Sequence, residues 1–115
     1  MAKSRISCIE KERLADNLFL SEILSTQNML AGRWKASIIW YLKDGKRRFK
    51  EIQHRMEGIS QGSLTKQLRE LEKDKLIHRT IYPVVPPKVE YSLTPSGKRM
   101  LSVLETMGNF GQNHS

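Results

Sequence analysis

The sequence of 115 residues contains a single cysteine, Cys8, and only three histidines, His54, His78 and His114. One cysteine cannot form a disulfide within the chain, and a cysteine-poor sequence is typical of a reducing compartment. The histidines are scattered and lack partners at the spacing of a zinc site. We therefore expect no structural disulfide, no metal centre and no other cofactor.

Long apolar runs are also missing. No stretch approaches the roughly 18 apolar residues of a membrane span, and the N-terminus lacks the apolar core of a secretory signal. The sequence has no glycine-rich phosphate loop and no motif of paired carboxylates, and Cys8 lies in a polar segment away from any histidine base. These absences predict a cytoplasmic protein that does not bind membranes and is not an enzyme.

Positive charge is abundant and unevenly distributed. The net charge is +8, and residues 33–99 hold 16 Lys or Arg against 7 Asp or Glu, which is +9 for that region. Residues 1–32 balance at 4 against 4. A basic region of this kind suits a nucleic acid, although charge alone would also attract RNA or an anionic membrane.

The most informative stretch runs from Gly58 to Asp74. Ser60 is a good N-cap, and Leu64, Leu68 and Leu71 recur at helical spacing on one face. The opposite face carries small, amide or cationic side chains, which suit a helix that reads base edges in the major groove. An ordinary amphipathic helix with a solvated face would share this pattern. The outward side chains are Gly62, Ser63, Thr65, Lys66, Arg69 and Lys73, with Gln61 and Gln67 on the flanks.

The neighbouring segments favour DNA recognition. Phe49, Ile52 and Met56 mark a short helix that ends near Gly58, so a glycine-containing turn joins two helices. Residues 77–82 and 88–93 alternate as two strands around a proline-rich loop, 83–87. Helix, turn, helix and hairpin predict a winged helix-turn-helix: an α+β, mostly helical fold with a two-stranded wing.

The two ends of the chain predict further helices. Residues 1–15 are polar, and we expect a loosely ordered N-terminal arm. A first helix is expected from Asp16 to Leu30, and a second reaches Leu42 or Lys43, with Trp34, Ile38, Ile39 and Leu42 facing inward. Thr94-Pro95 is an N-cap and N1 pair that opens the last helix. The first and last helices carry more apolar surface than a small monomer needs, which predicts dimerisation helices within a domain of residues 16–111 and a short tail, 112–115.

Five motifs stand out, at residues 32–35, 48–52, 58–61, 64–72 and 82–94. Together and in this order they resemble the HxlR-type transcriptional regulators, a bacterial and archaeal winged-helix group related to MarR. The resemblance covers roughly Phe19 to Gly111 and implies homodimeric DNA binding, dimer contacts from the first and last helices, and control of transcription. One departure is Lys75, where the family commonly has glycine; in the left-handed conformation of a helix C′ position it would cost about 1 kcal/mol.

The sequence predicts a DNA surface and a dimer surface. Lys46, Arg47 and Arg48 form the densest positive run, which suits phosphate contacts or a solvated loop, and Lys88 lies beside the rigid wing tip. For DNA we predict Ser60, Gln61, Ser63, Thr65, Lys66, Gln67, Arg69, Lys46, Arg47, Arg48 and Lys88. For the dimer interface we predict Phe19, Leu20, Ile23, Leu24, Leu101, Leu104 and Met107.

The functional prediction is a sequence-specific DNA-binding transcriptional regulator, a repressor that acts as a homodimer on an inverted-repeat operator. The alternative is a winged helix that binds RNA or an acidic protein. Several HxlR-type regulators sense oxidants through a cysteine early in the first helix, and this sequence has Ser21 at that position. Serine supplies no thiolate, so we predict that the protein is not a thiol switch. Any regulation would then come from a small molecule bound between the first helix, the last helix and the core, or from expression level alone.

Overall fold

The computed structural model of the protein describes residues 7–114, in two compact units. The first unit, up to Ala31, is one helix, α1 (Cys8–Met29). The helix begins at Cys8 rather than Asp16, so the prediction of a loose arm is wrong for residues 8–15; residues 1–6 lie outside the described part. Ser7 and Glu10 explain the earlier start. The Ser7 hydroxyl accepts from the Glu10 N–H (3.1 Å), and the Ser7 N–H donates to the Glu10 carboxylate (3.4 Å), which is a capping box.

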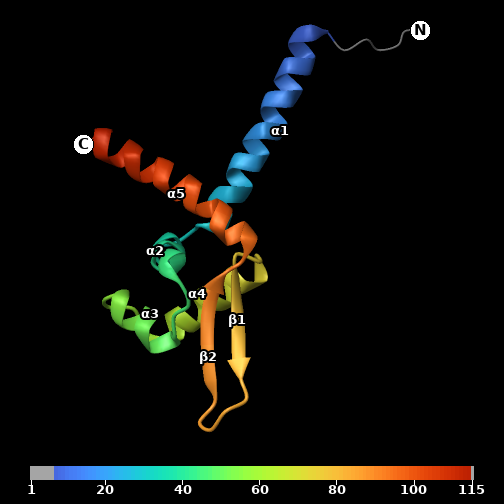
Figure 1. Ribbon diagram of the computed structural model, residues 1–115. Coiled ribbons are helices and arrows are strands. Elements are labelled where there is room, and N and C mark those ends of the chain that lie inside the picture. Colours follow the sequence, from blue (N-terminus) through green and yellow to red (C-terminus); the bar gives the residue numbers. More distant parts are fainter. Residues whose placement is uncertain (1–6, 115) are drawn as a thin grey trace. The chain divides into compact units, whose positions relative to one another are not determined.

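The second unit, residues 32–114, is a winged helix (Figure 1). Its two-stranded wing and helix-turn-helix confirm the predicted fold. The second helix ends at Tyr41, before the predicted Leu42 or Lys43, because the chain tightens there into a 3₁₀ turn. The elements are α2 (Lys35–Tyr41), the 3₁₀ turn η1 (Leu42–Asp44), α3 (Phe49–Arg55), α4 (Gln61–Lys73), β1 (Ile77–Tyr82), β2 (Lys88–Leu93) and α5 (Pro95–His114).

One apolar core holds these elements together. Isoleucine and leucine side chains from α2, α3, α4 and β1 meet in it, and their removal from water is the main stabilising contribution. As expected, Ile38, Ile39 and Leu42 face inward, whereas Trp34 is only half-buried. The largest fully buried side chains of the core are Ile38, Ile39, Ile52, Leu64, Leu68, Leu71 and Ile77.

The turn between α3 and α4 places the second helix. Gly58 has φ +88°, a conformation that glycine adopts without strain, and Ile59 beside it is buried. The hydroxyl of Ser60 then accepts from the N–H of Ser63 at 3.1 Å. This is the predicted N-cap, and it starts α4 with its leucine face on the core.

The wing is an antiparallel hairpin whose register runs from Ile77 opposite Leu93 to Tyr82 opposite Lys88. A third segment joins it. Arg47 and Tyr91 exchange two backbone hydrogen bonds, of 3.0 and 2.8 Å, so the loop before α3 lies along the outer edge of β2. The basic run is therefore anchored to the wing through Arg47.

The last helix starts as predicted, because Thr94 accepts from the Gly97 N–H at 3.0 Å and Pro95 is the first helical residue. Met100 and Leu104 are buried in the core of this unit. Placing Leu104 in the dimer interface was therefore wrong: it is 8% exposed and packs within its own chain. The predicted tail is also wrong for residues 112–114, which continue α5 without a break.

Lys75 ends α4 in the left-handed conformation, with φ 60°. The N–H of Leu76 donates to the carbonyl of Leu71 (3.0 Å) and that of Lys75 to the carbonyl of Glu72 (2.9 Å), which together form a Schellman motif. Lys75 therefore has the strained backbone conformation that the sequence predicted, which costs about 1 kcal/mol relative to glycine.

We expect Lys75→Gly to stabilise the protein by about 0.5–1 kcal/mol, because glycine relieves the strain but also gains freedom in the unfolded chain. Urea unfolding measures the difference. Lys73→Gly, in the last helical turn, is the matched control and should lower stability by up to about 1 kcal/mol. Equal destabilisation by both changes would contradict the prediction.

Candidate nucleic-acid interface

The outward face of α4 carries polar and cationic side chains, as predicted. Gln61, Lys66 and Arg69 are exposed and border a shallow depression, together with Gly62, Thr65 and Glu70. Arginine and glutamine present paired hydrogen-bonding groups that match guanine and adenine edges. The chemistry of this face suits a helix that reads the major groove.

Two of the predicted hydroxyls are already used inside the helix. Ser60 caps the first turn, and the Thr65 hydroxyl donates to the carbonyl of Gln61 at 2.9 Å. Ser63 and Gln67 are half-buried, and the Gln67 Oε1 is enclosed without a hydrogen-bond partner among the described residues. The exposed Gln61, Lys66 and Arg69 are therefore the side chains of this helix best placed to meet a ligand.

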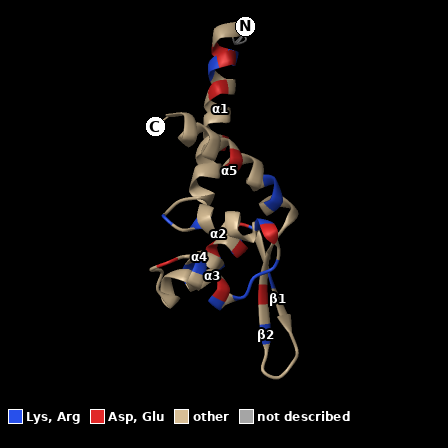
Figure 2. Cartoon of the chain, turned by 60° about the vertical axis from the view of Figure 1, so that its left-hand side comes forward, with Lys and Arg blue, Asp and Glu red and all other residues tan. Residues whose placement is uncertain are grey.

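The basic run before α3 is not a free loop. The guanidinium of Arg47 lies 4.9 Å from the centre of the Tyr41 ring, and Arg55 lies 5.7 Å from the same ring. The Nζ of Lys46 donates to the Tyr82 hydroxyl at 3.3 Å. Figure 2 shows lysine and arginine residues on this loop and on the hairpin. The loop and the wing thus form one basic region beside α4.

Near the tip of the wing, Lys88 is paired within its own chain. Its Nζ lies 3.6 Å from the Glu90 carboxylate and 4.9 Å from the centre of the Tyr82 ring. Burial would raise the pKa of Glu90, but the hydrogen bond from Tyr82 and the nearby lysines outweigh it and lower that pKa. Glu90 is therefore a carboxylate at neutral pH. Sequence reasoning singled out Lys46 and Lys88 but missed Tyr82 and Glu90, which connect them.

An ion pair between a buried lysine of α2 and a partly exposed glutamate of α4 joins these two helices. Lys35 is 6% exposed, and its Nζ lies 2.7 Å from the carboxylate of Glu70. The hydrogen bond from Lys35, helped by the charges of Lys35 and two further lysines, holds the pKa of Glu70 below its ordinary value of 4.5 despite partial burial. This pair orients the helix that carries the candidate DNA face.

We expect Glu70→Gln to destabilise the protein more than Lys35→Met, because the first change leaves a buried ammonium without its partner. The Glu70 side chain is 42% exposed and can be solvated when Lys35 is replaced.

The difference in free energy of unfolding between the wild type and Glu70→Gln should also depend on pH. Because the folded pKa of Glu70 is lowered, this difference should be complete above the ordinary value of 4.5. It should shrink as the pH falls below that value. Urea unfolding of the three proteins across this range measures both effects, and a pH-independent difference would contradict the assignment.

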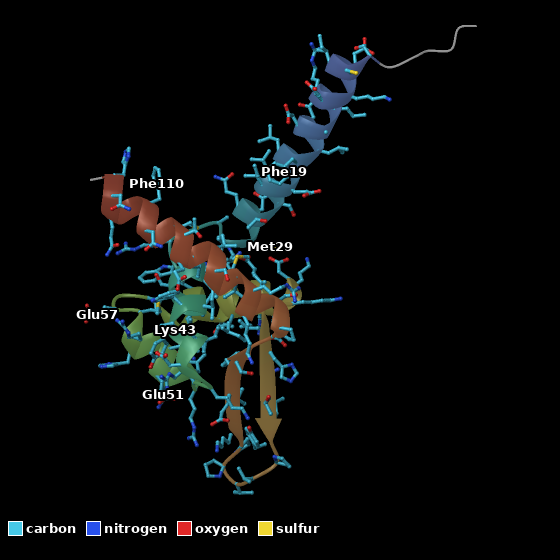
Figure 3. All side chains as sticks on the ribbon, turned by 45° about the horizontal axis from the view of Figure 1, so that its top comes forward. Phe19, Met29, Lys43, Glu51, Glu57 and Phe110 are labelled. Carbon is cyan, nitrogen blue, oxygen red and sulfur yellow. The ribbon has the colours of Figure 1, made fainter. Side chains whose placement is uncertain are left out.

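A cavity of about 830 Å³ opens between α2, the end of α3 and α5. Aromatic and apolar side chains form much of its wall, and the charged side chains at its edge include Lys43 and Glu57 (Figure 3). The apolar members are Trp34, Trp40, Tyr41, Met56, Leu104 and Met107.

Comparison with known proteins decides the family. The family model described as HxlR-like helix-turn-helix matches residues 29–115. The chain belongs to this family. HxlR-like membership confirms the resemblance seen in the five motifs, and with it a DNA-binding transcriptional regulator of helix-turn-helix type rather than an enzyme.

Individual relatives agree with the HxlR-like assignment. The chain is 42% identical over 99 residues to an HTH-type transcriptional regulator of Methanothermobacter thermautotrophicus, covering 86% of this chain and 76% of that protein. It is 44% identical over 90 residues to the HTH-type regulator YdeP of Bacillus subtilis, covering 78% and 70%. Both are regulators of transcription by name.

Solved structures match the HxlR-like chain closely. The redox regulator HypR in its reduced form aligns with a TM-score of 0.77 and 40% identity over 80% of this chain and 91% of that one. Reduced YodB from B. subtilis aligns with a TM-score of 0.75 and 35% identity over 81% and 91%. None of the described helices of this chain is both long enough and apolar enough to cross a membrane.

Proposed function

We propose that the protein is a transcriptional repressor that binds an inverted-repeat operator as a homodimer. The main support for a dimer is the exposure of α1. None of the described residues 7–31 is buried, and Phe19 is 63% exposed (Figure 3). A helix in water gains most of its stability by packing an apolar face, so this face favours a partner.

The proposed dimer contacts come from each of the two terminal helices. On α1 they comprise Phe19, Leu20, Ile23 and Leu24, each at least 46% exposed. On α5 they comprise Leu101 and Met107, and we add Phe110, which is 67% exposed and which the sequence argument overlooked. Two-fold symmetry then sets two copies of α4 against half-sites about 34–36 Å apart, one DNA turn, or a multiple of it. Occupancy of a promoter by such a dimer blocks transcription.

In this proposal each copy of α4 reads bases with Gln61, Lys66 and Arg69, while the basic run and Lys88 contact phosphates. Band shifts of duplex DNA from the gene's own upstream region, against RNA of matched length, test it. Preferential binding of the duplex, with a two-fold symmetric footprint over a promoter, is expected. Preference for the RNA, or an asymmetric footprint of a single chain, would favour the alternative of an RNA- or protein-binding winged helix.

We expect Arg69→Ala to weaken binding to the operator by about 1–3 kcal/mol and to relax the base preference at one position of each half-site. Lys88→Ala should instead weaken every duplex alike and lower the slope of log affinity against log salt by about 0.9 for each phosphate that is no longer neutralised. Arg99→Ala, on α5 outside the proposed DNA surface, is the control. Unchanged affinity and specificity in Arg69→Ala would show that another face of α4 meets DNA.

The cavity between α2, α3 and α5 supports a small aromatic effector as the regulating signal. Its wall includes Met107, which is also part of the proposed dimer surface. A molecule bound in the cavity would therefore alter the dimer contact and, through it, the distance between the two copies of α4. Ser21 occupies the position of the sensing cysteine of several HxlR-type regulators, and serine supplies no thiolate, which supports regulation without a thiol switch. The comparison of operator affinity for wild type and Cys8→Ser, with and without diamide, tests that point: a loss of binding that needs Cys8 would contradict it.

A further inference from the structure

Four side chains near the tip of the wing form one polar cluster, Lys46, Tyr82, Lys88 and Glu90. Antiparallel pairing sets Tyr82 directly opposite Lys88, and Glu90 lies two residues along on the same face. Lys46 reaches them from the loop before α3, which the backbone bonds between Arg47 and Tyr91 hold against β2. The residues thus come from three segments of the chain.

Tyr82 is the centre of this cluster. Its hydroxyl accepts a hydrogen bond from the Lys46 ammonium at 3.3 Å, and it is one of the groups that lower the pKa of the Glu90 carboxyl. The Lys88 ammonium lies over the Tyr82 ring, 4.9 Å from its centroid, within the range of a cation–π contact. The half-buried Tyr82 side chain therefore orients Lys46 through its hydroxyl and Lys88 through its ring.

The charges of the cluster leave it positive. Two ammonium groups face one carboxylate, so the sum is +1 and matches one phosphate of a DNA backbone. Lysine side chains are flexible, and ordering a free one on binding costs up to about 2 kcal/mol of rotamer entropy. Lysines that are already held by Tyr82 and Glu90 avoid much of that cost, which is the general advantage of preorganisation.

We propose that Tyr82 is a positioning residue for DNA binding: its hydroxyl holds Lys46 and its ring holds Lys88, so that both meet a single backbone phosphate. This inference rests on the DNA surface proposed above and adds to it a residue that carries no charge itself. It also assigns a role to Glu90, whose carboxylate lies 3.6 Å from the Lys88 ammonium and helps to keep it in place.

The two parts of Tyr82 can be removed separately. Tyr82→Phe deletes the hydroxyl that holds Lys46 but keeps the ring under Lys88, whereas Tyr82→Leu deletes both. Each change is combined with Lys46→Met and with Lys88→Met, and affinities for a labelled duplex from the upstream region and for a random duplex are measured across a salt series. Thr80→Val, which removes a hydroxyl from the same strand, is the matched control. Thermal unfolding verifies that every variant is folded.

Tyr82→Phe should weaken binding about threefold to tenfold, as expected for removal of one hydrogen bond, and should flatten the salt dependence. It should have no further effect in Lys46→Met, because the two changes disable the same contact. Tyr82→Leu should be non-additive with Lys88→Met as well. Both duplexes should lose affinity equally, since phosphate contacts carry no sequence information. Thr80→Val should bind like the wild type.

Full additivity of Tyr82→Phe with Lys46→Met, or no effect of Tyr82→Phe, would overturn the positioning role while leaving the proposed function intact. An effect confined to the upstream duplex would also overturn it, because it would indicate base reading by the wing. Failure of the wild type itself to bind either duplex in a salt-dependent way would contradict the proposed DNA surface and the inference together.

Discussion

Replacing Phe19 and Ile23 together by glutamate should convert the protein from a dimer into a monomer and lower its affinity for operator DNA by about a hundredfold or more. Both side chains lie on α1, where they are 63% and 49% exposed. Two glutamates per chain would put four carboxylates into an apolar interface, where unpaired charges are very costly. The effect on DNA follows because each half-site would then be bound independently.

The capping box should keep α1 folded in the variant, so that a change in assembly is not caused by loss of the helix. Ser7 and Glu10 start α1 at its N-terminus, far along the helix from the two substitutions, and glutamate is a good helix former. The helix itself should therefore persist in the variant. Light scattering with size-exclusion chromatography measures the oligomeric state, and anisotropy with operator DNA measures the affinity.

Ser21→Glu is the matched control. Ser21 is exposed on the opposite side of α1 from Phe19 and Ile23, so the same charge should leave the dimer and its DNA affinity unchanged. A dimeric Phe19→Glu/Ile23→Glu protein with normal DNA binding would show that α1 does not mediate assembly. A monomeric wild type with full affinity would contradict the dimer proposal altogether.

Local patterns predicted the winged helix because each of its elements carries its own signal. Ser60 caps α4 through a residue three positions away, and the leucines of that helix repeat at helical spacing. The strands alternate around a proline-rich loop, and their pairing follows from that alternation. The left-handed conformation of Lys75 was likewise predictable, since the resemblance placed it where glycine is usual.

The errors and omissions have two different causes. The start of α1 was missed although Ser7 and Glu10 carry a local signal, because the polar composition of the segment was given more weight than its cap. The pairs Lys35 with Glu70 and Lys46 with Tyr82 could not be predicted, because they join residues 35 and 36 positions apart. Charge and helical spacing identify surfaces, but contacts across elements depend on how the elements pack.

The same limit applies to Gly97, whose importance depends entirely on a distant segment. It lies in the first turn of α5, where a Cβ atom would overlap the backbone carbonyl oxygen of Leu76 and approach the Leu93 side chain to 3.1 Å. That carbonyl also accepts from the N–H of Thr94 at 3.1 Å, and the Thr94 hydroxyl donates to the carbonyl of Lys75 at 2.6 Å. The start of α5 is thus bonded to the end of α4, with no space for a side chain.

Gly97→Ala should therefore destabilise the protein by about 3 kcal/mol or more, the upper end of the range for overpacking, because the obstacle is backbone that hydrogen bonds hold in place. Gly62→Ala is the matched control: it is also a helical glycine, but its added Cβ meets nothing within 4 Å. Alanine there should leave stability unchanged or raise it by up to about 1 kcal/mol.

Urea unfolding of both variants and the wild type, at equal protein concentration and without DNA, measures the two changes. Opposite signs for the same chemical substitution would locate the cost in the contact with Leu76 rather than in helix propensity. A Gly97→Ala protein within about 0.5 kcal/mol of the wild type would mean that the junction between α4 and α5 can shift. In that case the Thr94 and Lys75 bonds do not fix the base of the last helix.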